Sequence, residues 1–509
     1  RGEEGWTVTL DAPSYGPFMT YSSQRDLKEQ LYKAYNTRAK GGEFDNMENI
    51  SKIANLRLQI ANLLGYETYA DYVLEDRMAE NRSTVTGFLN ELCDATMGYA
   101  QKDVETVTAF ARELGFEGEL MPWDWGYYNE KYKEAKYSIN DEQIKPYLEL
   151  SKVKEAVFML AGKLYGLTFT EVDNIDTYHP EATVYEVKDA SDKLMAILYL
   201  DFFPRESKRA GAWMTEFRGV KTVDGVEQRP LVQLVMNFTK PTANTPSLLT
   251  FDEFTTFLHE FGHGLHGILA QGKYESINGT SVKRDFVELP SQIMENWAFE
   301  PEIMKEYATH YKTGEVIPDR HIAKIQKAAL FNQGFTTTEL AAAALIDMDI
   351  HSLESYTDMN INDFEKYNLA TRRGLIPEIE PRYRYTYFAH IFNGGYSSGY
   401  YFYLWAEVLD KDAFAAFKES RDICDKELAH SFRYDLLAQG GQRAGMDMYR
   451  KFRGADPDKT AMLKARGLWT EPVVESEEVE VMETDSEFKP KVANQPGRPV
   501  MPAPKAPIK

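Results

Sequence analysis

The sequence predicts a mainly α-helical, two-lobed protein with a small β-sheet beside its most distinctive helix. Three observations support this prediction. Apolar residues recur every three or four positions from about residue 23 to 165 and again from 251 to about 467, which is typical of helices. Between about 167 and 240 the period changes to two, which is typical of strands. The chain has 509 residues, 43% of them hydrophobic, which suffices for a large core.

The first part of the chain, residues 1–165, is predicted to be a helical lobe. We expect residues 6–10 to be extended, with a turn region after them that contains prolines at positions 13 and 17. Further on, four residues have the spacing of a buried helix face: Ile53, Leu56, Leu58 and Ile60.

The middle of the chain is predicted to form the sheet. Asp224-Gly225 predicts a hairpin-like turn between two of its strands. Beyond the sheet, Asp252 and Glu253 are expected in the first turn of a helix, where the helix dipole favours negative charge. The predicted strands are 168–172, 183–187, 194–203 and 231–238.

The last residues differ in composition from the rest. An acidic run at 475–487 is followed by a segment rich in Pro and Lys at 489–509. Such a composition buries too little apolar surface to fold, so we expect 471–509 to be a disordered tail. The predicted organisation is therefore a helical lobe at 1–165, a second region at 166–470 and this tail.

Composition also excludes several classes of partner. The net charge of −21 argues against nucleic acid and against an anionic membrane surface. No apolar run has the length of a membrane span. The two cysteines, Cys93 and Cys424, support no disulfide framework. The chain opens at Arg1 without a signal-like segment, so a cytoplasmic location is the expectation and a periplasmic one the alternative.

The most informative pattern is HExxH, formed by His259, Glu260 and His263. On a helix, residues four apart lie on one face, so the two imidazoles can bind one metal ion together. Glu260 lies beside them, where it can take a proton from metal-bound water. The alternative is a surface helix whose histidines have no such role.

A catalytic zinc site usually has three protein ligands, so a third must be found. His266 follows His259 by seven residues, which separates their backbones by about 10.5 Å along a helix, too far for one ion. A metzincin site needs Gly at 265 and His at 269, and both positions are Leu. Glu288 is the remaining candidate, because the proline after it predicts a helix start there. Glu295 shares its face and is suited to hydrogen-bond a ligand histidine.

Three segments together resemble the thimet oligopeptidase family of zinc peptidases. They are HEFGH at 259–263, DFVELPSQIMENW at 285–297, and a later histidine, glycine pair and tyrosine at 390–396. The resemblance covers most of residues 5–470. It implies a gluzincin-type fold with a deep channel and one zinc ion per chain. It also implies that His259, His263 and Glu288 bind the zinc, and that Glu260 is the general base.

The tyrosine-rich segment 382–405 is predicted to support the reaction. Protonated tyrosine can donate a hydrogen bond to a developing oxyanion, and nearby glycines allow close approach to substrate. Without the zinc motif, the same segment would be read as an aromatic core helix. The resemblance implies catalytic roles for His390, Tyr400 and Tyr403, and a substrate-binding role for Tyr396.

Within the family, the chain resembles the peptidyl-dipeptidases (dipeptidyl carboxypeptidases), which release C-terminal dipeptides from short peptides. The segments concerned are 381–396, Asn278-Gly279-Thr280 and SKRAGAWM at 207–214. Arg382 and Arg384 are candidates to bind the free carboxylate, with a structural ion pair as the alternative. Asn237 ends a strand to which a peptide can add, unless that strand is already paired on both sides.

Two other functions stay open. One is an endo-acting oligopeptidase of the same family, and the other is a catalytically inactive protein that binds zinc or peptide. Family members usually carry a longer N-terminal helical region, much of which is missing here. Because of this, a separate N-terminal fragment is a candidate partner. The chain itself is expected to be a monomer.

Overall fold

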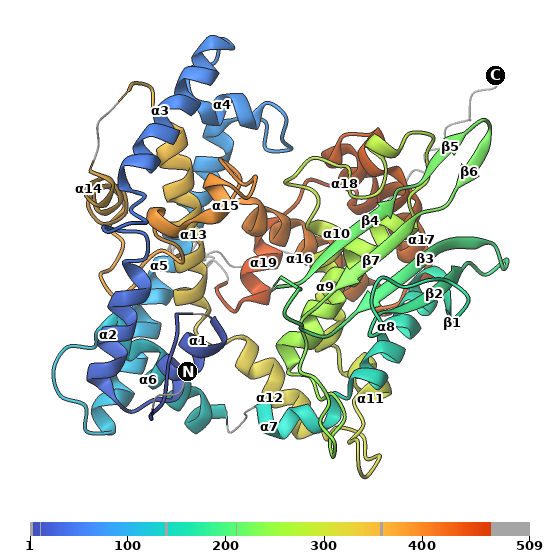
Figure 1. Cartoon of the computed structure of the whole chain (residues 1–509), viewed down its shortest axis with the longest axis horizontal. Helices are drawn as coiled ribbons and strands as arrows, with labels where there is room; N and C mark the ends of the chain where they lie inside the picture. The colour runs from blue at the N-terminus through green and yellow to red at the C-terminus, as the bar shows by residue number, and fades with distance from the viewer. Residues whose placement is uncertain (1–3, 11, 138–140, 210, 357–359, 470–509) are drawn as a thin grey trace, which may run out of the picture. The chain divides into compact units, whose positions relative to one another are not determined.

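The computed structural model describes residues 4–10, 12–137, 141–209, 211–356 and 360–469 (Figure 1). The described residues belong to one compact unit. The predicted tail, 471–509, lies outside the described residues. The boundary predicted at residue 165 coincides with the end of a helix and stays a prediction.

The part before the sheet is helical, as predicted. Its helices are α1 (Ala12–Tyr21), α2 (Arg25–Asn36), α3 (Met47–Leu63), α4 (Tyr69–Leu74), α5 (Arg82–Glu113), α6 (Pro122–Tyr137), α7 (Asp141–Ile144) and α8 (Leu150–Tyr165). The predicted turn region after residues 6–10 is wrong, because residues 12–21 form α1, with Pro17 inside it. Tertiary packing overrides the local signal here: Tyr15 of α1 stacks on Tyr35 of α2, with ring centroids 4.0 Å apart.

Helix α3 forms where predicted but buries another face. Its buried side chains include Ile50, Ala54 and Leu58, whereas Leu56 and Ile60 are about half exposed, at 55% and 49%. Apolar residues recur every three or four positions on two faces of this helix, so spacing alone does not identify the buried one. The face that carries the small residue Ala54 faces the protein interior.

The sheet has five strands in the order β1-β2-β3-β7-β4, with β3 and β7 parallel and the other neighbours antiparallel. The four predicted strands are present, and β4 and a separate β5–β6 hairpin were not predicted. Asp224 and Gly225, both with positive φ, form the turn of that hairpin rather than joining two of the predicted strands. The strands are β1 (Thr168–Val172), β2 (Thr183–Lys188), β3 (Leu194–Asp201), β4 (Trp213–Arg218), β5 (Lys221–Val223), β6 (Val226–Gln228) and β7 (Leu231–Val235).

The chain after the sheet is again helical. Helix α9 carries the HExxH motif and packs beside β7 and β4 (Figure 1). The mainly helical fold with a small sheet beside the motif helix is thus confirmed. The helices are α9 (Phe251–Ile268), α10 (Leu289–Glu295), α11 (Pro301–Tyr307), α12 (Asp319–Ala329), α13 (Gln333–His351), α14 (Ile361–Lys366), α15 (Ala389–Phe392), α16 (Phe402–Ser420), α17 (Lys426–Ser431), α18 (Gly445–Arg453) and α19 (Lys459–Ala465).

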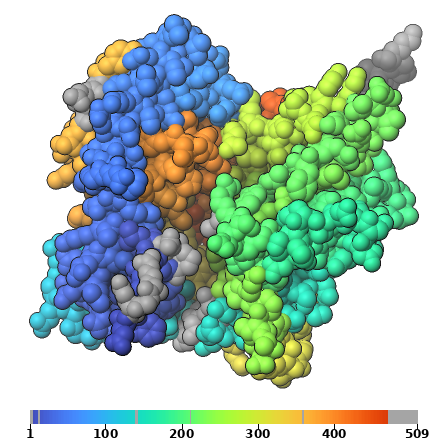
Figure 2. Space-filling view, viewed as in Figure 1, coloured from blue at the N-terminus to red at the C-terminus, as the bar shows by residue number. Residues whose placement is uncertain are grey.

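The described residues form two large hydrophobic cores, and each combines residues from before and after position 165. One joins the sheet to α8, α9 and α10. The other joins α3, α4 and α5 to α13 and α16. Trp405 of α16 packs against both cores. On the face drawn in Figure 2, a furrow runs between the green surface of the sheet and the blue surface of the early helices.

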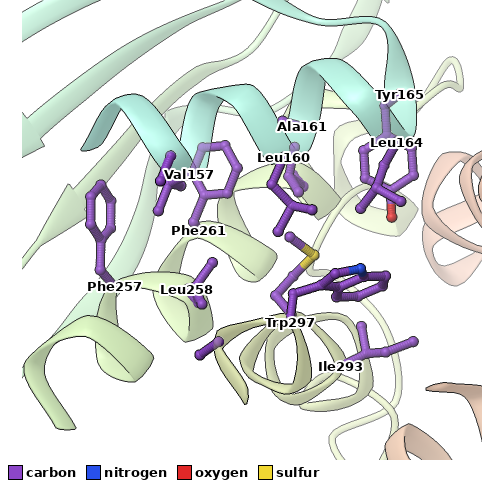
Figure 3. Packing of buried hydrophobic residues seen from close by; sticks show 14 of the residues in the cluster. Val157, Leu160, Ala161, Leu164, Tyr165, Phe257, Leu258, Phe261, Ile293 and Trp297 are labelled. Atoms are coloured by element: carbon purple, nitrogen blue, oxygen red, sulfur yellow. The ribbon is translucent and has the colours of Figure 1, made fainter. Parts of the chain in front are cut away.

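The motif helix is held on its apolar side by α8. Val157, Leu160 and Leu164 of α8 point toward Phe261 of α9 and toward Trp297 just beyond α10 (Figure 3). All five side chains are buried, so this contact fixes α9 and α10 as one body. In the described part of the chain, no helix is long and apolar enough to cross a membrane.

Candidate active site

Helix α9 begins with a capping box. The Thr250 hydroxyl accepts a hydrogen bond from the Glu253 amide at 3.0 Å, and the Glu253 carboxylate accepts one from the Thr250 amide at 2.8 Å. Such a cap satisfies two amides that would otherwise lack partners at the helix start. It sets where the helix begins, and so which residues of the motif face α10.

Gly262, inside the motif, allows α10 to approach. A Cβ atom at this position would lie 2.2 Å from the Pro290 carbonyl oxygen and 2.6 Å from the Ser291 Cα. Backbone cannot move away as the tip of a side chain can, so only glycine fits at this contact. The contact brings the start of α10, and Glu288 just before it, beside the two motif histidines.

His259, His263 and Glu288 form a group of side chains that can hold a metal ion. One ligand atom from each lies within 4.8 Å of the others. The Glu288 Oε2 atom is 3.3 Å from His259 Nε2 and 3.2 Å from His263 Nε2. Tetrahedral ligands about 2.0–2.1 Å from one ion are about 3.3–3.4 Å apart, so these separations suit zinc.

A second carboxylate orients one of the histidines. The Glu295 Oε1 atom lies 2.7 Å from His259 Nδ1, which leaves Nε2 facing Glu288. The Ser291 hydroxyl donates to Glu288 Oε2, the oxygen that faces the two histidines, at 3.0 Å. Partners of this kind fix the rotamers and the tautomer that a metal site requires.

The charges in this group depend on each other. Burial opposes the charged form of His259, but hydrogen bonds to Glu288 and Glu295 outweigh it and raise its pKa. Burial likewise opposes ionised Glu288, and hydrogen bonds to the two histidines outweigh it and lower its pKa well below the ordinary value. The carboxylate is therefore held ionised, the form in which it binds a cation.

Glu260 lies beside this group and is 6% exposed. Burial raises the pKa of its carboxyl group, and the nearby His259 and His263 partly offset this effect. Its Oε2 atom has no hydrogen-bond partner among the described residues. A buried carboxylate oxygen with no protein partner is available to a small polar molecule.

His266 is not part of the group of candidate ligands, in agreement with the distance argument. Its side chain is fully buried, and burial, then the nearby His263, lowers its pKa to about 3. Neither of its ring nitrogens has a partner among the described residues. The imidazole is neutral and packs in the core.

A cavity of about 720 Å³ adjoins the group. It reaches Glu295, which holds His259, and extends to the tyrosine-rich segment. The cavity thus connects Glu295 with the predicted residues of that segment, and the three candidate ligands lie behind Glu295 and are not among the residues that line it. Its lining includes Gln292, Glu295, Arg382, His390, Tyr400 and Tyr403.

The predicted tyrosines and histidine form one aromatic cluster. The ring of Tyr400 lies 5.5 Å from that of His390 and 5.5 Å from that of Tyr403. Tyr396 stacks on Tyr403 at 5.7 Å, and the Arg284 guanidinium lies 5.0 Å from its ring centre. Burial raises the pKa of Tyr400 and Tyr403, so both hydroxyls keep their protons. Burial, then Arg382, lowers the pKa of His390.

The glycine pair after His390 shapes the turn that follows it. A Cβ atom on Gly394 would lie 2.9 Å from the His390 Cα, and Gly395 has a φ of 82°. The Tyr396 amide donates to the His390 carbonyl at 3.0 Å and closes the turn. The sequence HIFNGGY thus brings its histidine and its tyrosine together.

The two predicted arginines have different surroundings. Arg382 is on the cavity wall with Tyr400 and Tyr403. Arg384 forms ion pairs with Glu365 at 2.6 Å and with Glu380 at 3.1 Å, and it is not among the residues that line this cavity. For Arg384 the alternative of a structural ion pair agrees with the structure.

Asn237 lies two residues beyond β7, a strand that is paired on both sides. The prediction that peptide adds to this strand is therefore wrong for β7 itself, since β4 occupies its second edge. The Asn237 side chain donates to the carbonyls of Arg209 and Gly211, at 3.0 and 2.6 Å. It joins the end of the sheet to the loop before β4.

Sequence reasoning missed the ionic groups at the far end of the cavity. Arg466 pairs with Glu407 at 2.6 Å, and Lys411 with Asp410 at 3.0 Å. Burial raises the pKa of Asp410 to about 7, although Lys411 opposes this. Charged residues spaced along a helix resemble a solvated face, so no pattern in the sequence indicated these ion pairs.

Comparison with known proteins identifies the family. The pattern of peptidase family M3 matches residues 18–468. Oligopeptidase A of Escherichia coli (strain K12) is 39% identical over 91% of this chain and 69% of its own length. Dipeptidyl carboxypeptidase of the same organism is 38% identical over 91% of this chain and 68% of its own. Among solved structures, "PZ peptidase A with inhibitor 2" has a TM-score of 0.49 at 14% identity, over 91% of this chain and 71% of that chain. The resemblance seen in the sequence is confirmed, and the chain belongs to peptidase family M3, a family of metallopeptidases.

Proposed function

We propose that the protein is a zinc peptidase that releases C-terminal dipeptides from short peptides. The observation that carries the proposal is the group of His259, His263 and Glu288, whose partner Glu295 lines the same cavity as the tyrosine-rich segment. The three side chains offer two imidazole nitrogens and a carboxylate, a donor set typical of catalytic zinc. When bound there, zinc lowers the pKa of water and polarises carbonyl groups.

Glu260 is the proposed general base. Its free carboxylate oxygen lies next to the ligand group, and its raised pKa favours uptake of a proton. In hydrolysis, Glu260 accepts a proton from the attacking water and passes it to the amine of the departing dipeptide. The new C–O bond forms first and leaves the oxyanion, and the peptide C–N bond breaks when Glu260 delivers the proton to the amine. One water molecule is consumed: its OH group stays on the acyl carbon and its proton goes to the departing dipeptide.

Tyr400, Tyr403 and His390 are the proposed donors to the oxyanion and to the peptide. The two hydroxyls keep their protons because burial raises their pKa, and such groups donate hydrogen bonds. Loss of one oxyanion donor typically costs about 10²–10³ in kcat. Tyr396, stacked on Tyr403, is proposed to support its ring and to contact substrate.

Release of dipeptides requires that a free carboxylate be recognised two residues beyond the cut, a span of about 7 Å. Arg382 is the proposed receptor, because it is on the same cavity wall as Tyr400 and Tyr403. The 38% identical relative is named for this activity, and the 39% identical oligopeptidase A supports the second candidate, endo cleavage.

A peptide series separates these two candidates. Acetylated peptides that end in a carboxylate or in an amide are compared by mass spectrometry of their products. A peptidyl-dipeptidase cleaves the acid form two residues from its end and the amide form poorly. Equal cleavage of both forms, at internal bonds, would establish the oligopeptidase. No hydrolysis of either form by the zinc-loaded protein would establish an inactive binding protein.

Arg382 and Arg384 provide a matched pair of variants. Arg382→Gln should raise KM for the acid peptide about tenfold or more, since a charge-assisted hydrogen bond contributes about 1.5–3 kcal/mol. Arg384→Gln should leave the ratio of acid to amide cleavage unchanged, because its partners are Glu365 and Glu380. An unchanged acid-to-amide ratio in Arg382→Gln would assign the carboxylate to another residue.

We propose that the protein is a monomer that acts on peptides in the cytoplasm, with the periplasm as the alternative compartment. A separate N-terminal fragment is the one macromolecular partner proposed. Analytical ultracentrifugation of the purified chain measures its oligomeric state directly. A dimer at micromolar concentration would contradict it.

A further inference from the structure

The segment 389–401, which carries His390, Tyr396 and Tyr400, has little regular structure to hold it in place. Helix α15 ends at Phe392, and α16 begins only at Phe402. Ser398 has a φ of 52°, a left-handed conformation that is unfavourable for a residue with a Cβ atom. Other contacts must therefore fix the segment.

Asp347 of α13 holds the second half of the segment through its backbone. The Asp347 carboxylate is fully buried and accepts hydrogen bonds from three successive amides. Ser398 donates to Oδ1 at 2.9 Å, and Gly399 and Tyr400 donate to Oδ2 at 2.8 and 2.9 Å. Successive amides around an anion form a nest, which requires a left-handed residue such as Ser398.

His351, one turn further along α13, connects this carboxylate to Arg57 of α3. The His351 Nδ1 atom lies 2.8 Å from Asp347 Oδ1, and its Nε2 atom lies 2.6 Å from Arg57 Nη1. A guanidinium group only donates, so Nε2 accepts and the ring proton is on Nδ1. His351 therefore donates to Asp347, and Arg57 donates to His351.

Arg57 also holds the first half of the segment. Its Nη1 and Nη2 atoms donate to the carbonyls of Ile391 and Phe392, at 2.8 and 3.3 Å. These residues directly follow His390. Tyr69 of α4 covers the group: its ring lies 5.4 Å from that of His351 and 5.3 Å from the Arg57 guanidinium.

We propose that Arg57, His351 and Asp347 are positioning residues that set where His390 and Tyr400 stand at the active-site cavity. This inference rests on the proposed function, in which those two side chains act on the substrate. Arg57 binds the segment at 391–392 and Asp347 binds it at 398–400, on either side of its glycine turn. His351 connects these two residues. Asp347 and His351 belong to α13, and their position is fixed because α13 packs along α5 in the second hydrophobic core. Donors to a transition state must be held within about 0.5 Å, which the segment alone does not provide.

The principal test is Asp347→Asn. The amide has the shape of the carboxylate, but its NH₂ group faces a backbone amide that needs an acceptor. We expect kcat to fall about 10- to 100-fold, the effect of a displacement near 1 Å, with less change in KM and with full zinc content. Hydrogen exchange of the amides at 398–400 should become faster. In the unmodified protein these amides should be the slowest of the segment 393–401.

Two further variants keep the test decisive. Asp412→Asn removes a buried carboxylate that accepts from Tyr449 at 2.6 Å and from Arg453 at 3.2 Å, both in α18. It should lower the Tm without changing kcat or exchange at 398–400. If Asp347→Asn does not fold, half-buried Arg57→Lys takes its place, with a smaller change in the same direction.

The outcomes separate this inference from the proposed function. Unchanged exchange at 398–400, or a kcat within twofold of the original in folded, zinc-loaded Asp347→Asn, overturns the inference. Tyr400→Phe is measured in parallel. If it lowers kcat while Asp347→Asn does not, only the positioning role fails. If it leaves kcat unchanged, the proposed role of Tyr400 fails, and the exchange measurement still decides whether Asp347 anchors the segment.

Discussion

The two halves of the active site are built in different ways. The metal-binding half lies within residues 259–295, on two helices that touch at Gly262. The tyrosine half, residues 390–403, is held by residues as distant in sequence as Arg57, Asp347 and His351. Helix geometry fixes the first half, and long-range polar contacts fix the second.

This difference implies different sensitivities. In the metal-binding half, removal of one ligand or of the ion removes the chemistry, while the backbone keeps its place. In the tyrosine half, substitution of a residue that never touches substrate displaces several donors together. We expect large, all-or-none effects in the first half and graded effects in the second.

Removal of the metal should give the largest effect. A chelator should abolish hydrolysis, and added zinc should restore it, because His259, His263 and Glu288 then lack the ion that they are proposed to bind. Metal content by atomic emission and peptide hydrolysis are measured together. Exchange of the amides at 398–400 should not change, since Asp347 holds them. Hydrolysis that continues without bound metal would refute the mechanism.

Glu260→Gln should give the next effect. Loss of a general base typically lowers kcat by about 10²–10⁴. Zinc should remain stoichiometric, because Glu260 is not among the three candidate ligands. Glu295→Gln is the contrasting variant: it loses a carboxylate that orients His259, so zinc affinity should fall about 10- to 100-fold. Unchanged turnover in Glu260→Gln would eliminate it as the base.

Gly262→Ala should weaken the contact between the two helices of the metal-binding half. The added methyl group would lie 2.2 Å from the Pro290 carbonyl oxygen, so α10 must shift and move Glu288 with it. We expect the free energy of unfolding to fall by about 1–3 kcal/mol, with weaker zinc binding. Gly98→Ala in α5 is the control: nothing lies within 4 Å of its added methyl group, so stability should rise by about 0.5–1 kcal/mol. Equal effects in both variants would contradict the argument.

The sequence was most informative where the structure is local. The spacing of His259 and His263, the proline after Glu288 and the position of Glu295 all depend on helix geometry, and the structure brings these residues together. The predicted strands and the mainly helical fold follow from apolar periodicity in the same way.

Contacts between distant segments had no such signal. No spacing connects Arg57 to His351, and Asp347 looks like one acidic residue among many on a helix. Arg382 and Arg384 are two residues apart, yet one lines the cavity and the other forms ion pairs with Glu365. Helix α3 has apolar residues on two faces, and only packing shows which one is buried.

The smallest expected effect on zinc binding and hydrolysis concerns Glu216 of β4, which contacts α9 from the sheet. Its Oε1 atom lies 2.5 Å from where a Cβ atom on Gly267 of α9 would be, and it has no hydrogen-bond partner among the described residues. Burial, then the charge of Glu275, raises its pKa from 4.5 to about 7. The folded protein therefore keeps a proton that the unfolded chain releases near pH 4.3.

The sign of the pH effect follows from this difference. Between about pH 4.3 and 7 the folded state binds more protons at Glu216 than the unfolded state, so the free energy of unfolding falls as the pH rises. Glu216→Gln keeps the shape and stays neutral, so its stability should exceed that of the original above pH 7 and match it near pH 4. Urea unfolding at pH 5 and pH 8 measures the difference, and zinc affinity should not change. A stability difference that is the same at both pH values would mean that Glu216 is ionised in the folded protein, and that the contact of β4 with α9 tolerates a buried charge.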